Sequence, residues 1–274
     1  MRVSGFYRDG EAWIAVAVED GYAWLAPVNE FYADVQAALQ RARALRQADV
    51  EDAPRAVPVP ASAKVLCAGL NYAAHAAEAR RELPSHPDVF ARWASTLTVA
   101  DGLVPLPTNE PGLDWEGELA AVIGRELKDA TPEDVEASLV GYTIVNDLSA
   151  RLHQRATVQW GIGKNADLSA PLGPDLVTAD ELGDPYSLRI RTIVSGETMQ
   201  DGNTSEIIFT VGQIGAYASE TMTLRPGDVI STGTPPGIGS IRKPPVFLTD
   251  GQQVDVEIEK IGTLRSRIGT GSPL

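Results

Sequence analysis

The chain has 274 residues, 43% of them hydrophobic and 22% charged, so it can bury a large core as one domain with a small appendage. Its net charge of -14 and its lack of a Lys/Arg cluster argue against nucleic-acid binding, because phosphate contacts need clustered cations. With no apolar run near the roughly 18 residues of a membrane span, no signal-peptide pattern and a single cysteine, we expect a cytoplasmic protein without a membrane partner.

The first part of the chain predicts a small N-terminal α+β domain. Residues 1–28 alternate short apolar runs with turns, which predicts an antiparallel meander. Apolar residues then recur at helical spacing over residues 31–45, which predicts one helix of about four turns packed on the meander. Three prolines in residues 52–62 cannot continue a helix and predict a linker. We therefore expect a domain of residues 1–60, followed by a larger domain of residues 61–274.

A candidate acid–base pair follows the next predicted strand, residues 64–69. The composition of residues 73–81 predicts a helix, on which His75 and Glu78 lie three residues apart. Their side chains are then neighbours, and the carboxylate can orient the imidazole as a general base toward water. The alternative is an ordinary surface His–Glu pair, because such pairs are common and weak.

Three acids on two predicted strands indicate a divalent-metal site. In DWEGELAAVIG, Glu116 and Glu118 point to the same face of a strand, and Gly117 leaves the other face free of bulk. The apolar run 119–123 predicts that this strand is covered, so a cation would offset the repulsion between the two acids. Asp147 ends a second strand and completes an oxygen-only donor set, which favours Mg²⁺, then Mn²⁺ or Ca²⁺, over Zn²⁺. The alternative is a solvated edge strand with alternating acids.

Three further residues are candidates for substrate or oxyanion contacts. Arg151 follows Asp147 by four residues and is either a ligand for a substrate carboxylate or a surface cation paired with an acid. Lys164 lies in a Gly- and Pro-rich loop between buried segments, which favours a role in neutralising an oxyanion. The loop 233–237 offers amides and the Thr234 hydroxyl to a carboxylate, unless it is a plain connecting turn.

The rest of the chain predicts scaffold. Residues 187–200 and 254–268 each predict a hairpin, and Asn203 is placed to cap a helix over residues 204–219. Strand signals with few intervening helices predict an α+β fold, predominantly β, with antiparallel and mixed sheet.

Six segments in order resemble the fumarylacetoacetate hydrolase family over roughly residues 64 to 268. They are GLNYAAHAAE, DWEGELAAVIG, GYTIVNDLSAR, GKNADLSAPLGP, QDGNTSEIIFTVGQIGAY and LRPGDVISTGTPPGIG. The resemblance implies a mixed β-sheet roll like the C-terminal domain of that family. It also implies a homodimer, since family members are usually dimeric and the many strands offer more surface than one small sheet covers.

The resemblance implies a metal-dependent enzyme in which Glu116, Glu118 and Asp147 hold the ion. In family terms, Lys164 lies beside the metal and Gln154 matches a position that often contacts substrate. At the substrate end the chain departs from its relatives, which usually carry an acid directly after the matching arginine, where this chain has Leu152 and His153. Relatives also more often carry an aromatic residue at the position of Ala166.

The expected activity is hydrolysis of a carbon–carbon bond in a 2-oxo or 1,3-diketo acid, such as an acylpyruvate, or in a diketone, with a place in aromatic or diketone catabolism. The pair His75–Glu78 would activate water, and the metal with Lys164 would stabilise the expelled carbanion as an enolate. A decarboxylase of the oxaloacetate type, or a hydratase or isomerase of keto-enol acids, would use the same enolate. A metal-bound protein that has lost activity is also open.

Overall fold

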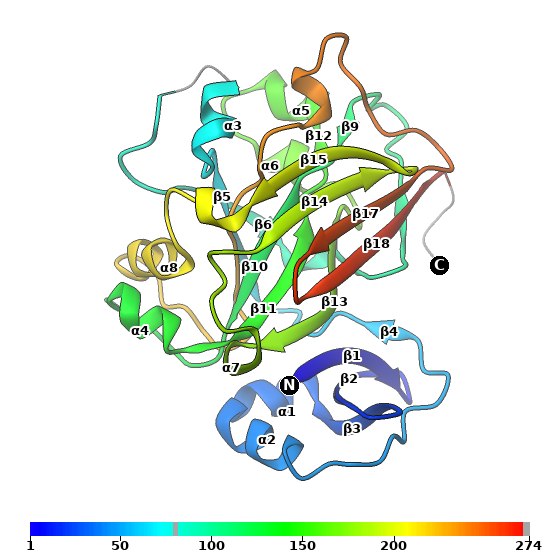
Figure 1. The fold of residues 1–274 in the computed structure, drawn as a ribbon, viewed down its shortest axis with the longest axis vertical. Helices are drawn as coiled ribbons and strands as arrows, with labels where there is room; N and C mark the ends of the chain where they lie inside the picture. Colours follow the sequence, from blue (N-terminus) through cyan, green and yellow to red (C-terminus); the bar gives the residue numbers. More distant parts are fainter. Residues whose placement is uncertain (79–81, 271–274) are drawn as a thin grey trace.

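The computed structural model describes residues 1–78 and 82–270, without the side chains of residues 75–77. It is an α+β fold made mostly of β-strands, as predicted (Figure 1). Within the described residues the strands form three sheets, of eleven, five and two strands.

The eleven-stranded sheet runs through the whole molecule. In spatial order its strands are β3 (Gly21–Pro27), β2 (Glu11–Val18), β1 (Arg2–Arg8), β13 (Ala170–Thr178), β11 (Leu139–Asn146), β10 (Gly117–Ile123), β16 (Val229–Ser231), β5 (Lys64–Gly69) and β6 (Asp88–Trp93), with β4 (Arg55–Ala56) beside β1 and β7 (Leu97–Val99) beside β13. Two of its pairings, β16 with β5 and β13 with β7, are parallel, so the sheet is mixed. Every residue of β10 is buried, as expected for a strand covered on both faces.

A second sheet covers one face of this strand. Its order is β15 (Glu197–Asn203), β14 (Arg189–Val194), β17 (Gln253–Ile258), β18 (Gly262–Gly269) and β8 (Leu103–Pro105), and it contains both predicted hairpins. Leu119, Ala121 and Ile123 share one hydrophobic core with residues of β14 and β17. Ala120 and Val122 belong to a second core, shared with the N-terminal strands and helices. The alternation along β10 therefore decides which side chains face each core.

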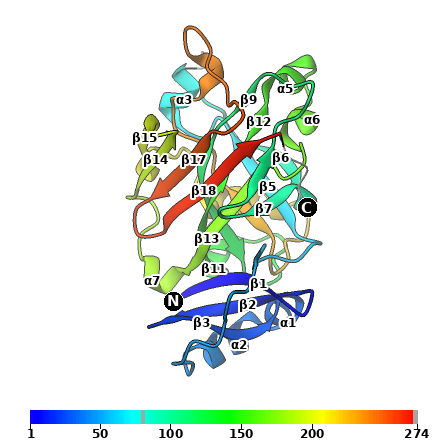
Figure 2. The same cartoon turned by 90° about the vertical axis from the view of Figure 1, so that its right-hand side faces the viewer.

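The helices are short. They are α1 (Val28–Ala33), α2 (Val35–Ala42), α3 (Ala73–Glu78), α4 (Pro132–Glu136), α5 (Arg151–Ala156), α6 (Gly161–Lys164), α7 (Ala179–Leu182) and α8 (Val211–Ser219). In Figures 1 and 2, α3, α5 and α6 lie at one end of the molecule, while α1, α2 and β1–β3 lie at the other. Helices α4 and α8 lie together along one side (Figure 1). Of the helices in the described ranges, none is long and apolar enough to cross a membrane.

The N-terminal meander is confirmed, but the single helix predicted over residues 31–45 is wrong. Asp34 breaks it, with a φ of -151° and a ψ of 81° that no helix accommodates. The Asp34 carboxylate accepts a hydrogen bond from the Ala37 amide at 3.0 Å and so begins α2 as a separate helix.

The helix predicted over residues 204–219 also begins later than expected. Asn203 caps only a 3₁₀ turn, Thr204–Glu206, and the Ile208 amide then donates to the Asn71 carbonyl at 2.8 Å, which draws the chain out of helix. Helix α8 begins after Thr210, which forms a capping box with Gln213.

The predicted linker is packed against the fold. Strand β4 lies inside residues 52–62 and pairs with β1, and Val59 is buried, so the segment predicted to be a linker is part of the packed structure. Strand β1 also pairs with β13, with Arg2 opposite Val177, which joins the meander to the central sheet by backbone hydrogen bonds. A domain boundary near residue 60 stays a prediction.

Candidate active site

The register of two central strands brings the predicted acids together. Gly117 in β10 lies opposite Asn146 in β11, so Glu116 and Glu118 flank the same point at which Asp147 leaves its strand. The Asp147 amide donates to the Glu116 carbonyl at 2.8 Å, which extends the ladder by one step.

Gly117 is required because the second sheet packs directly on it. A Cβ atom at this position would lie 2.4 Å from Thr192 Oγ1 and 2.8 Å from Val256 Cγ1. The glycine therefore faces the five-stranded sheet, and Glu116 and Glu118 extend from the opposite side of the strand, as predicted.

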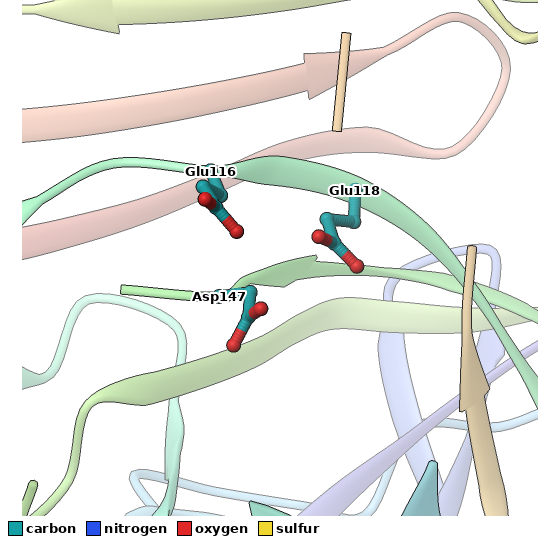
Figure 3. Close-up of side chains that lie close together, drawn as sticks. All are labelled: Glu116, Glu118 and Asp147. Atoms are coloured by element: carbon teal, nitrogen blue, oxygen red, sulfur yellow. The ribbon is translucent and has the colours of Figure 1, made fainter. Parts of the chain in front are cut away.

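The three carboxylates form a buried oxygen-only cluster. One carboxylate oxygen from each of Glu116, Glu118 and Asp147 lies within 4.8 Å of the others, and the three residues are 6%, 1% and 0% exposed. Figure 3 shows them converging from the two strands. This burial rules out the solvated edge strand, and the cluster could bind a divalent cation that prefers hard oxygen ligands.

Glu118 is a buried carboxylate whose ionised form is disfavoured by its surroundings. Burial, and then the neighbouring charges of Asp147 and Glu116, raise its pKa well above the usual range. Its Oε2 accepts hydrogen bonds from the Ser231 hydroxyl and from the Gly233 amide at 3.0 Å. These donors fix the carboxylate in place, and a bound cation would offset the remaining repulsion.

Lys164 lies inside this cluster. Its Nζ atom is 2.6 Å from Glu116 Oε2 and also bonds with Asp147 Oδ2. Burial alone lowers the pKa of Lys164, but the Asp147 and Glu116 carboxylates outweigh it, so the net pKa is raised. The residue is therefore a buried cation at the acids, not a solvated loop lysine.

Arg151 is also buried rather than at the surface. Its guanidinium reaches Asp114 Oδ2 at 2.8 Å and Glu116 Oε1 at 2.5 Å, and it donates to Gln154 Oε1 at 2.8 Å. From the first turn of α5, Arg151 thus holds Glu116 and Gln154 in place. It is paired with acids, as one alternative predicted, but it lies in the site and not at the surface.

A cavity of about 580 Å³ unites these groups, within the range of about 300–1,000 Å³ usual for small-molecule sites. The predicted site residues that line it are Glu116, Glu118, Arg151, Gln154, Lys164 and Thr234. Apolar side chains form much of the remaining wall, among them Phe90 and Trp160, whose ring centroids lie 5.4 Å apart. The cavity therefore combines a charged surface with an apolar wall.

The predicted helix with the acid–base pair is present as α3, but the His75 side chain lies outside the described residues. Glu78 is exposed, and its Oε2 accepts a hydrogen bond from the Gly237 amide at 3.1 Å. This contact ties the end of α3 to the loop that contains Thr234.

That loop binds the protein's own acids. The Thr234 hydroxyl donates to the Gly117 carbonyl at 2.9 Å and accepts from Gln200 Nε2 at 2.8 Å. Its Gly233 amide holds Glu118. We expected these groups to grip a substrate carboxylate; in the structure they fix the start of β10, and Thr234 still lines the cavity.

Sequence reasoning missed two charged residues behind the cluster. Arg92 in β6 is fully buried and bonds with Asp147 through Nε. The Asp114 carboxylate accepts hydrogen bonds from the Arg151 guanidinium and from two amides, that of Gly239 at 2.7 Å and that of Ser240 at 3.0 Å. The alternating acids at 114, 116 and 118 were a usable signal for Asp114, whereas Arg92 had none.

Comparison with known proteins identifies the family of this chain. A sequence model of the fumarylacetoacetate (FAA) hydrolase C-terminal family matches residues 64–269. The chain belongs to the fumarylacetoacetate hydrolase family. It is 40% identical over 248 residues to oxaloacetate tautomerase FAHD2A, mitochondrial, of Homo sapiens, covering 88% of this chain and 79% of that protein.

Two further matches are named as hydrolases. The chain is 42% identical over 222 residues to 2,4-didehydro-3-deoxy-L-rhamnonate hydrolase of a Sphingomonas species, covering 80% of this chain and 78% of that protein. The solved fumarylacetoacetate hydrolase of the psychrophile Exiguobacterium antarcticum has a TM-score of 0.79 at 34% identity, covering 99% of this chain and all 100% of that one. These names confirm a family of enzymes that includes tautomerases and hydrolases, and they do not select one reaction.

The departure from the fumarylacetoacetate hydrolase pattern after Arg151 has a structural counterpart in Glu110. This buried carboxylate accepts from the amides of Gly112 at 2.8 Å, Leu152 at 3.1 Å and His153 at 3.0 Å, and its Oε2 lies 2.8 Å from His153 Nδ1. Burial raises the pKa of Glu110, but the hydrogen bonds from His153 and the amides outweigh it and lower the net value. Glu110, an acid from another segment, thus lies at the start of α5, next to the position where relatives carry their acid.

We expect Glu110→Gln to raise KM about tenfold, with a smaller effect on kcat, because a carboxamide cannot accept four donors and the first turn of α5 would shift with Arg151. Steady-state kinetics measure this split, with the exposed Glu133→Gln as a control of equal charge change. A lowered unfolding temperature with an unchanged KM would show that Glu110 supports stability alone.

Proposed function

We propose that this protein is a divalent-metal-dependent enzyme that converts a 2-oxo or 1,3-diketo acid through its enolate. The observation that carries the proposal is the cluster of three buried carboxylates, Glu116, Glu118 and Asp147, of which Glu116 and Glu118 line a cavity of small-molecule size. Glu116 and Asp147 pair with buried cations. Glu118 is held instead by the Ser231 hydroxyl and the Gly233 amide, so a bound ion would offset the cost of burying Glu118.

The chain's own residues divide the work as follows. Glu116, Glu118 and Asp147 would hold the ion, which when bound acts as a Lewis acid on the 2-oxo group. Lys164 presents a fixed positive charge at the same acids and would stabilise negative charge that develops on the substrate oxygen. Arg151 keeps Glu116 and Gln154 in position, and the Nε2 of Gln154 remains to donate to substrate.

The reaction favoured first is keto–enol tautomerisation of a 2-oxo acid. It needs enolate stabilisation, the transfer of a proton from the carbon beside the 2-oxo group to solvent water, and the return of a proton from water to the enolate oxygen. A relative at 40% identity is named oxaloacetate tautomerase. Carbon–carbon hydrolysis, the reaction predicted from the sequence, is the second candidate, supported by the rhamnonate hydrolase relative and by α3, which carries His75 beside the Thr234 loop. Decarboxylation would use the same enolate.

One panel separates these reactions. Protein loaded with Mg²⁺ or Mn²⁺ is mixed with oxaloacetate, acylpyruvates and 1,3-diketones, while enol absorbance and products are followed. Faster enol–keto conversion without new products supports tautomerisation, and cleavage of acylpyruvate into two acids supports hydrolysis. Activity that is absent from every substrate, or that survives complete chelation, contradicts the proposal.

The proposal also includes Mg²⁺ as the ion, a homodimer as the assembly and the cytoplasm as the location. The first follows from the donor set and the other two from the sequence.

A further inference from the structure

The lining of the cavity contains a second arginine, Arg155. Arg155 lies one helical turn after Arg151 on α5, so the two side chains share one side of the helix, and both line the cavity. Arg155 is exposed, and among the residues that the structure describes it has neither a hydrogen bond nor an ion pair. Its guanidinium is available to a ligand.

The other two cations in the cavity lining form ion pairs with carboxylates of the protein itself. Lys164 is balanced by Glu116 and Asp147, and Arg151 by Asp114 and Glu116. Each of these cations already pairs with two buried carboxylates, so a substrate carboxylate would have to compete with both of them. Of the three cations in the described lining, Arg155 is therefore the one available to pair with a second negative group on a substrate.

The negative charge of the surroundings favours a local cation for an anionic substrate. The chain carries a net charge of -14, and Asp88 adds an exposed acid to the cavity lining, so a dianion is repelled unless a local cation outweighs this field. Phe90, Trp160 and Ile238 supply apolar wall for the carbon atoms of a substrate. Two groups in the cavity could therefore bind a carboxylate: the acid cluster once it holds an ion, and Arg155.

We propose that Arg155 binds the second carboxylate of the substrate, so that the enzyme is selective for 2-oxo dicarboxylic acids over 2-oxo monocarboxylic acids. This inference rests on the proposed function, because the ion held by the acid cluster would take the 2-oxo group and the carboxylate beside it. A guanidinium suits the role, since it pairs with a carboxylate through two parallel hydrogen bonds.

The test compares matched ligands on the metal-loaded protein. Calorimetry measures the Kd of 2-oxoglutarate and 2-oxobutyrate, and kinetics measure kcat/KM for oxaloacetate and pyruvate, for wild type and Arg155→Gln. We expect wild type to prefer the dicarboxylates and Arg155→Gln to reduce that preference roughly tenfold to a hundredfold. Arg225→Gln, which removes an exposed arginine outside the cavity, should keep it.

The outcomes separate the two proposals. Dicarboxylate preference that survives in Arg155→Gln, or is absent from wild type, overturns the assignment of Arg155, even if 2-oxo acids are turned over. Preference in binding that Arg155→Gln removes, without turnover of any 2-oxo acid, supports the assignment and contradicts the proposed function instead.

Discussion

We expect His75→Ala to slow cleavage of an acylpyruvate by roughly 10²- to 10⁴-fold, the loss typical of a missing general base. Tautomerisation or decarboxylation of oxaloacetate should lose much less, because neither reaction needs an activated water. The prediction depends on α3, which holds Glu78 in contact with the Gly237 amide and so places the helix at the loop that lines the cavity. Both activities are measured on the same preparations, with metal saturation checked for each.

Glu78→Gln provides the companion variant. If Glu78 orients the imidazole, its loss should reduce cleavage in the same direction as His75→Ala and again leave the enolate reactions largely intact. Equal losses of both activities in His75→Ala would mean that the residue positions α3 or the substrate, and it could no longer be called the hydrolytic base.

Replacing Glu118 by glutamine should weaken Mg²⁺ or Mn²⁺ binding by well over tenfold, which corresponds to more than about 1.4 kcal/mol. The substitution keeps an acceptor for the Ser231 hydroxyl and the Gly233 amide. It also removes one of three mutually repelling buried charges. The metal-free variant should therefore unfold at the same temperature as wild type or higher, while the rise in unfolding temperature on adding metal should disappear.

Glu136→Gln is a suitable control for this experiment. Glu136 is a half-buried acid outside the cavity that accepts hydrogen bonds from the Tyr142 hydroxyl and the Gly212 amide, at 2.8 and 2.9 Å. Its loss should lower stability and leave metal affinity unchanged. Wild-type metal affinity in Glu118→Gln, measured by calorimetry, would remove this acid from the proposed site.

The acid cluster was predictable because alternation along a strand is a local rule. DWEGELAAVIG specifies which side chains share a face, and Gly117 marks the side on which the second sheet packs. Asp147 followed from the end of the next strand. Their meeting needed only antiparallel pairing of β10 with β11, the commonest relation between neighbouring strands.

The partners of these acids were less predictable, because they come from distant segments. Arg92 lies 55 residues from Asp147 in the sequence, and Glu110 lies 43 residues from His153. Composition and spacing carry little information about such contacts, which depend on how strands and loops pack. The family resemblance pointed to Lys164, but its two carboxylate partners became visible only in the structure.

The errors in the helices have a different physical origin. Periodicity over residues 31–45 continues across Asp34, yet the Asp34 side chain bonds with the Ala37 amide and stops the first helix. Thr210 likewise begins α8, through a capping box with Gln213, later than apolar periodicity predicts. Short polar side chains compete with the helical backbone for its hydrogen bonds, and apolar periodicity is insensitive to that competition.

Exchange of hydrogen for solvent deuterium at the carbon beside the 2-oxo group tests enolate formation most directly, because it requires neither cleavage nor release of a product. NMR would follow this exchange for oxaloacetate and an acylpyruvate against the spontaneous rate. We expect metal-loaded wild type to accelerate the exchange, and chelation or Glu118→Gln to remove the acceleration. A protein that binds its metal normally and leaves exchange at the spontaneous rate for both compounds would contradict the proposed enolate chemistry.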